Sequence, residues 1–232
     1  MLFTIPLYAQ RNSWDCSSFT TYKNQIMLRV NLNAGIASYF GDLSIYDLNP
    51  AGKISDESLP GYSGVAILQL TRVFSIAGQI LHANPKASMD SITFRTEIFE
   101  YNLHGRVDFL KLLNISHYPG LCFEGYAGIG QFYYAVTRET GEGVSKVETT
   151  YKPNIPEFVY FFGGGIAYRV SKYASLSIDL AIRQCQTDRL DDYITNGDFD
   201  YYSYLSMGIT IDVGRIINPY LKSRYTLKKR RY

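Results

Sequence analysis

The sequence lacks any uninterrupted apolar segment long enough to form a transmembrane helix. A membrane-spanning helix needs roughly 20 consecutive apolar residues, and no such run occurs among the 232 residues of the chain. Charged residues are also scarce, at 19% of the chain, and the net charge is only +2. The net charge therefore identifies no class of partner, and a membrane location would require another kind of spanning element.

Cysteine is too rare for a disulfide framework, because the chain has three cysteines, which is an odd number. Cys122 and Cys185 fall on predicted strands separated by one other strand, and strand spacing is roughly 4.8 Å. Two spacings are too far for an unstrained disulfide, so we interpret both as small wall residues, with a redox role as the alternative. Cys16 follows Asn-Ser-Trp-Asp, which lacks the small apolar lead-in of an acylated lipoprotein cysteine.

Motifs for cofactor, metal or catalytic chemistry are missing as well. His82, His104 and His117 have no spacing typical of metal ligands. The glycines at 163–165 lie within a predicted strand and have no following helix or Lys-Ser/Thr pair, so they do not form a phosphate loop. We expect no cofactor, no metal and no catalytic residue. A lipid-modifying barrel enzyme is the alternative. The sequence argues against it, because none of the histidines begins the His-x-Ser pattern of lipid A deacylases.

What the chain does contain is alternation of apolar and polar residues with a period of two, which is the signature of β-strands. Between residues 174 and 187, one face carries Leu176, Ile178, Leu180 and Ile182, and the other carries Ser177, Asp179, Ala181, Arg183 and Cys185. Such runs are about as long as the roughly 9–11 residues that a tilted strand needs to cross a bilayer. Aromatic residues make up 15% of the chain, which suits interfacial girdles.

The placement of lysine predicts which face is outside. Every lysine falls in a predicted turn, loop or terminus: Lys23, Lys53, Lys86, Lys111, Lys146, Lys152, Lys172, Lys222, Lys228 and Lys229. A water-facing sheet would normally carry Lys and Glu along its polar face. Here the polar face holds mostly Gly, Ala, Ser, Asn and Tyr, which can fill a narrow lumen. We therefore expect the apolar face to contact lipid.

The alternating runs predict eight strands, near residues 27–40, 64–71, 74–80, 99–109, 121–136, 158–170, 174–187 and 204–213. Their connections alternate between long and shorter ones, as in an up-and-down barrel with an even number of strands. The predicted fold class is all-β: an eight-stranded antiparallel up-and-down transmembrane β-barrel. We expect it in the bacterial outer membrane, with the termini and short turns in the periplasm and the long loops outside.

Charged residues on the inward face of these strands predict an ionic network in the lumen. Eight strands enclose an interior that side chains fill, so no solute pore is expected. The predicted lumen residues are Arg29, Glu100, Arg106, Asp179, Arg183 and Asp212. Their expected role is structural, as paired ions in a cramped interior.

The ends of the chain differ from the barrel region, residues 26–214. Residues 1–10 resemble the tail of a secretory signal peptide without its basic region, with an N-terminal strand as the alternative, and residues 11–25 are expected to be a periplasmic lead-in. Residues 215–232 form a basic periplasmic tail, whose bases are Arg215, Lys222, Arg224, Lys228, Lys229, Arg230 and Arg231. The tail is either solvated or contacts an acidic periplasmic partner, and nucleic acid is not expected there.

Four segments carry a resemblance to a known family. They are GIASYFGDL at 35–43, FRTEI at 94–98, GYAGIG at 125–130 and TDRLDDY at 187–193. Together they resemble the small OmpA-like outer-membrane barrel family that includes the type IX secretion component PorG, and the similarity extends over roughly the whole barrel. The resemblance implies a non-enzymatic component of a protein secretion machine that anchors a periplasmic ring lipoprotein and its companion subunit. An adhesion or binding barrel acting through its outer loops is a further alternative.

Overall fold

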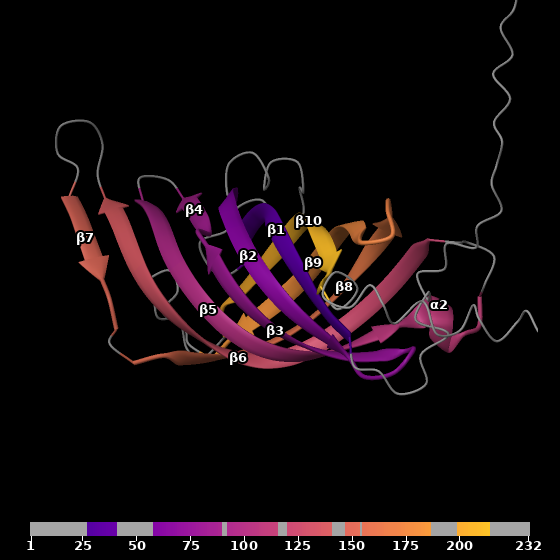
Figure 1. Ribbon diagram of the computed structural model, residues 1–232. Helices are drawn as coiled ribbons and strands as arrows, with labels where there is room; N and C mark the ends of the chain where they lie inside the picture. Colours follow the sequence, from indigo (N-terminus) through magenta and orange to yellow (C-terminus); the bar gives the residue numbers. More distant parts are fainter. Residues whose placement is uncertain are drawn as a thin grey trace, which may run out of the picture.

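A computed structural model describes residues 27–40, 58–89, 92–115, 120–140, 147–153, 155–186 and 199–213. Nearly all of them lie in strands (Figure 1). The barrel wall consists of β1 (Met27–Phe40), β2 (Ser58–Gln69), β3 (Phe74–Ala83), β5 (Ile92–Asp108), β6 (Leu121–Thr140), β8 (Glu157–Arg169), β9 (Ala174–Cys185) and β10 (Tyr201–Asp212). No helix in these ranges is long and apolar enough to cross a membrane.

The eight wall strands form a closed antiparallel ring. Its order is β1, β2, β3, β5, β6, β8, β9 and β10, and β10 pairs with β1 to close it. Leu32 shows the register at the closure, because it lies opposite Gly64 on β2 and opposite Ile209 on β10. The predicted eight-stranded up-and-down barrel is therefore confirmed.

The two shortest connections between consecutive wall strands, from β2 to β3 and from β8 to β9, use the same hydroxyl-capped turn. Thr71 Oγ1 accepts a hydrogen bond from the backbone N–H of Phe74 at 2.9 Å. Ser171 Oγ accepts the equivalent bond from Ala174 at 3.0 Å. A Ser or Thr hydroxyl that bonds the following backbone is typical of tight turns. We call this end of the barrel the short-turn end.

Predicted loops contain additional elements. β2 begins at Ser58, six residues before the expected start at Gly64. β4 (Lys86–Met89) and β7 (Val147–Tyr151) lie in predicted loops, as does α2 (Phe109–Leu112) in part. The expectation that all lysines lie outside strands is therefore wrong for Lys86, which begins β4, although β4 is not part of the barrel wall.

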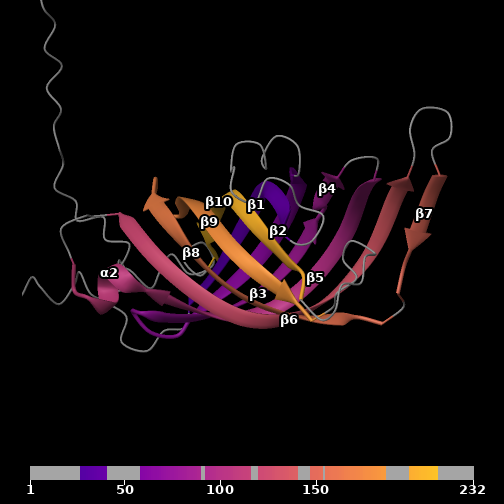
Figure 2. The ribbon, with the colours of Figure 1, turned by 180° about the vertical axis from the view of Figure 1, so that it is seen from behind.

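β5 and β6 extend beyond the ring at the end opposite the short turns. The pairing of β3 with β5 stops at Ile98, and the pairing of β8 with β6 stops at Phe132. Beyond these residues β4 pairs with β5 and β7 pairs with β6. The result is a four-stranded flap, formed by β4, β7 and the outer parts of β5 and β6, and β7 lies at the opposite end of the molecule from α2 (Figures 1 and 2).

The interior near the flap is an apolar and aromatic core. It contains Ala37, Tyr39, Leu81, Ala83, Phe94, Ile98, Phe132, Tyr134, Val136, Val159, Cys185, Tyr202 and Tyr204. Tyr39 and Phe94 meet edge to face, with ring centroids 5.0 Å apart. This core fills the half of the barrel nearer the flap. Polar residues occupy the half nearer the short turns.

The two faces of the wall have the polarity of a membrane protein. Met207 and Leu32 are 66% and 63% exposed on the outside, whereas Arg183 and Glu100 are 1% and 0% exposed within. Charged residues are almost never fully buried unless they are paired. Apolar side chains outside and paired ions inside are the arrangement of a transmembrane barrel.

Two cysteines lie among the described residues and differ in state. Cys185 is a free, buried thiol. Cys122 is disulfide-bonded. The prediction that Cys122 and Cys185 do not bond to each other is confirmed because Cys185 is free, but the sequence analysis missed the disulfide at Cys122 because it considered only the distance between these two cysteines. Cys16, His117, residues 1–25 and the basic tail, residues 215–232, lie outside the described residues.

Candidate functional site

The charged lumen is the candidate site, and it contains all six residues predicted for it. Arg29, Glu100, Arg106, Asp179, Arg183 and Asp212 are all buried. They project inward from β1, β5, β9 and β10 at alternate strand positions, because the lipid-facing positions between them are apolar.

The most buried ion pair joins β5 to β9 across the lumen. Arg183 Nε lies 3.2 Å from Glu100 Oε2 and 3.4 Å from Oε1. The Tyr202 hydroxyl donates a further hydrogen bond to this carboxylate. A buried carboxylate is tolerated only when its oxygens are bonded in this way.

Amide side chains complete the surroundings of that pair. Asn102 Nδ2 donates to Glu100 Oε1, and also to Gln79 Oε1 at 3.1 Å. Gln79 Oε1 in turn accepts from Arg183 Nη2 at 3.2 Å. The Arg183 guanidinium also lies 5.1 Å from the ring centroid of Phe161, within the range of a cation–π contact.

Arg106 forms the centre of a second cluster, closer to the short turns. Its Nε donates to Glu124 Oε2 at 2.9 Å, and its Nη2 donates to Asp179 Oδ1 at 3.2 Å. The guanidinium also stacks 4.7 Å from the ring centroid of Tyr126. One arginine thus connects three wall strands, β5, β6 and β9.

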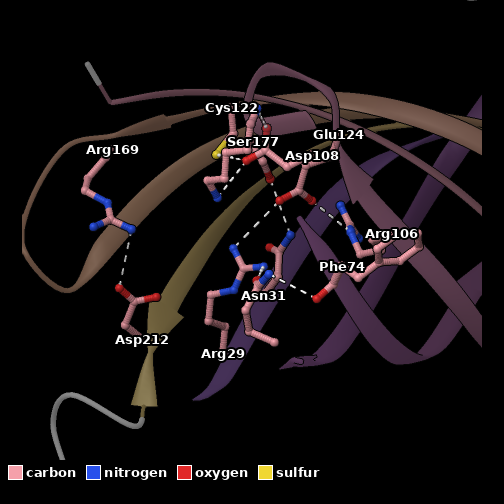
Figure 3. Close-up of polar contacts among 12 residues, drawn as sticks. Arg29, Asn31, Phe74, Arg106, Asp108, Cys122, Glu124, Arg169, Ser177 and Asp212 are labelled. Carbon is pink, nitrogen blue, oxygen red and sulfur yellow. Dashed lines mark hydrogen bonds and ion pairs between the residues drawn. The ribbon is translucent and has the colours of Figure 1, made fainter. Parts of the chain in front are cut away.

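Arg29 extends this cluster to the barrel rim. Its Nη1 lies 3.8 Å from Glu124 Oε1 (Figure 3). Its Nη2 donates to Gln69 Oε1 at 2.8 Å. Gln69 Nε2 then donates to the backbone carbonyl of Thr71 in the β2–β3 turn, at 2.6 Å. The ionic network therefore reaches the short-turn end through a single amide side chain.

His104 connects the two clusters. Its Nδ1 lies 3.0 Å from Asn102 Oδ1, and its Nε2 lies 3.5 Å from Arg106 Nη1. The imidazole ring also packs against Phe161, with ring centroids 5.5 Å apart. Polar contacts are thereby continuous from Glu100 in the middle of the barrel to the turn at the rim.

Two further pairs lie near the short-turn end. Arg169 Nη2 is 3.7 Å from Asp212 Oδ2, and this pair stands apart from the Arg29 group (Figure 3). Asp108 caps α2 by accepting from the backbone N–H of Lys111 at 3.1 Å, and it also pairs with the Lys111 ammonium at 2.7 Å. Cys122 Sγ touches Asp108 Oδ2 at 3.4 Å, which is a contact rather than a donated bond because a disulfide sulfur carries no proton.

The sequence prediction missed two of the charged partners. Glu124 bonds Arg106 and approaches Arg29, and Arg169 pairs with Asp212. Both residues occupy inward positions of strands that were predicted. Assigning faces along β6, where Glu124 follows the inward Cys122 by two residues, would have found the first.

These lumen charges balance. Arg29, Arg106, Arg169 and Arg183 face Glu100, Glu124, Asp179 and Asp212, which makes four cations and four anions. Within this set each charge has a partner of opposite sign, and the interaction within the pairs offsets part of the desolvation cost. The network can cross-link the wall from within.

A cavity of about 20 Å³ remains between the lumen side chains, which is room for one water molecule. Its lining includes Arg29, Asn31 and Asp179. Arg29 Nε, Asn31 Oδ1 and Asp179 Oδ2 make no hydrogen bond to any described residue. One donor and two acceptors around such a space match the bonding capacity of a single water.

Metal chemistry finds no support in the described residues. No group of three or more His, Cys, Asp or Glu side chains in these ranges could hold a metal ion. What the described lumen offers instead is rigidity, because its bonds join strands that are distant in sequence.

Comparison with known proteins establishes the fold alone. No protein-family profile matches the chain, and no curated protein is similar to it in sequence. Among solved structures, a major outer membrane protein from Thermus thermophilus is similar over 79% of this chain and 98% of its own, with a TM-score of 0.52 and 10% identity. Neisserial surface protein A matches over 81% of this chain and 99% of its own, with a TM-score of 0.46 and 14% identity.

Proposed function

We propose that this chain is a non-enzymatic outer-membrane barrel that anchors periplasmic partners of a protein secretion machine of the type IX kind. The observation that carries the proposal is the filled lumen, with an apolar core in one half and paired ions in the other. A barrel filled in this way offers no path for solutes, so its contacts with other proteins are expected at its two ends. The resemblance to the PorG-containing family supports the secretion role.

The proposed periplasmic end is the short-turn end, because short turns of such barrels face the periplasm. The basic tail, residues 215–232, follows the last wall strand at that end and would be the docking element. Its expected partners are the ring lipoprotein and its companion subunit, held by attraction to an acidic surface.

Neutralising the tail tests this role without removing it. Lys228, Lys229, Arg230 and Arg231 are replaced together by glutamine, and a second variant lacks residues 221–232. Both should assemble as normal barrels but recover less ring lipoprotein on co-purification and secrete less cargo. Raised salt should weaken recovery with the unaltered chain, because charge attraction is screened over about 8 Å at physiological ionic strength. Full recovery and secretion with both variants would refute a docking role for the tail.

Adhesion through the outer end is a second candidate, and the flap is the observation that favours it. β7 pairs with β6 and lies beyond the barrel ring, where an edge strand can pair with another chain. Deleting residues 141–153 should abolish surface binding in whole cells if adhesion is the function, and should leave secretion unchanged.

A further inference from the structure

The outer face of the barrel carries a hollow that the lumen does not explain. A groove of about 860 Å³ crosses β6, β8, β9, β10 and β1 on the lipid-facing side. Its lining is almost entirely apolar and includes Leu32, Ile166, Ile178 and Met207. Apolar exposure is expected anywhere on this face, so the shape of the groove, rather than its polarity, marks it as a site.

Small residues produce the shape. Ala34 and Gly164 face outward in the groove, beside the long side chains of Met207 and Ile166. Glycines at 165 and 208 also line it, and a glycine can line a groove only with its backbone. The floor of the groove is therefore the barrel wall itself.

The lumen network requires those two floor glycines. A Cβ at Gly165 would lie 2.3 Å from Asp179 Oδ1, and a Cβ at Gly208 would clash with the side chain of Asn33. Polar lumen side chains thus pack directly against the wall beneath the groove. A single backbone layer separates the ionic network from the groove.

The groove lies in the half of the barrel nearer the short turns. Tyr168 and Leu176 both line it, and they pair with each other across the β8–β9 hairpin close to its turn. That turn exposes Lys172 and Tyr173. Tyrosine and lysine at this level are typical of the lipid headgroup region.

We propose that the groove binds one acyl chain of a phospholipid from the periplasmic leaflet, with the headgroup near the β8–β9 turn. The groove is continuous with the lipid-facing surface, and its volume lies within the roughly 300–1,000 Å³ of small-molecule sites. A peptide strand would need polar partners for its backbone, whereas a hydrocarbon chain needs none. The choice of leaflet rests on the proposed periplasmic placement of the short turns.

Native mass spectrometry of the full chain, extracted from outer membranes in mild detergent, tests the site. The expected result is one retained phospholipid per barrel. Ala34→Phe fills the groove and should reduce retention at least tenfold. Ala66→Phe is the matched control, because Ala66 is also exposed on the outer face but lies outside the groove. The control should retain its phospholipid.

A second pair of variants keeps the test decisive if Ala34→Phe does not fold. Gly164→Leu fills the groove from β8, and Gly105→Leu is its control because a Cβ at Gly105 meets no atom within 4 Å. Folding of each variant is checked by the shift in migration of unboiled samples on SDS gels. After delipidation, vesicles of phosphatidylethanolamine carrying a photoreactive acyl chain should label Met207 or Ile166.

Several results would overturn the proposal. These are the absence of retained lipid, equal retention in both groove-filling variants and their controls, retained lipopolysaccharide instead of phospholipid, and a dimer or protein partner whose contact the groove variants abolish. Neither tail variant alters the groove. Loss of lipid retention and loss of partner docking can therefore be told apart.

Discussion

Breaking the Glu100–Arg183 pair should destabilise the barrel far more than breaking an exposed ion pair. Arg183→Met leaves the Glu100 carboxylate buried without its cation, at a site where the two side chains are 0% and 1% exposed. Removing one partner of a buried pair costs about 3–5 kcal/mol. The variant should therefore unfold at markedly lower urea concentration.

The chain supplies a matched control. His82 Nε2 lies 3.6 Å from Glu97 Oε1, but these side chains are 43% and 63% exposed. Glu97→Gln should cost less than about 1 kcal/mol, because exposed ion pairs contribute little.

A double variant separates loss of the charge from loss of packing. Glu100→Gln combined with Arg183→Met removes both charges, and its cost should fall below the sum of the two single costs by about 0.5–3 kcal/mol. The assay is urea unfolding in phospholipid vesicles, followed by the migration of unboiled samples. If Arg183→Met costs no more than Glu97→Gln, or if the single costs are additive, the reasoning about the lumen is refuted.

Three other predictions concern the wall. Ile178→Arg should destabilise the inserted barrel by about 2–4 kcal/mol by placing a charge in lipid, whereas Ser177→Arg should disturb lumen packing; urea unfolding that leaves Ile178→Arg unaffected would mean that the faces are reversed. Gly165→Ala should cost about 1–3 kcal/mol by displacing Asp179, and Gly105→Ala should be nearly neutral in the same assay. The Cys185 thiol should resist maleimide in the folded barrel and react after unfolding, and rapid labelling of the native protein would contradict its burial.

The wall faces could be predicted because lipid and lumen impose opposite polarity on neighbouring residues. Along β9 every second residue from Leu176 to Ile182 is apolar and exposed, whereas Asp179 and Arg183, at the alternate positions, are buried. The same alternation of inward and outward positions predicts which charged residues lie in the lumen. It does not predict which of them pair, since Arg106 and Asp179 are 73 residues apart and only the strand order brings them together.

Other elements were missed for identifiable reasons. The start of β2 contains Pro60 and Gly61, which indicate a loop locally, yet Pro60 lies opposite Ile36 in the ladder with β1. β4 and β7 have only four and five residues, which is too few for a period of two to emerge. Both form because β5 and β6 extend beyond their other neighbours, a feature of the register that only the folded structure reveals.

Lipid quenching of single tryptophans tests most directly the claim that this barrel is apolar outside and filled inside. The only tryptophan, Trp14, is replaced by Phe, and Tyr204→Trp or Leu205→Trp is added on β10. Tyr204 is 2% exposed within the lumen, and its neighbour Leu205 is 37% exposed on the outer face. In vesicles with brominated acyl chains, the tryptophan at 205 should be strongly quenched and the one at 204 should not. Equal quenching at both positions, or quenching at 204 alone, would contradict the account.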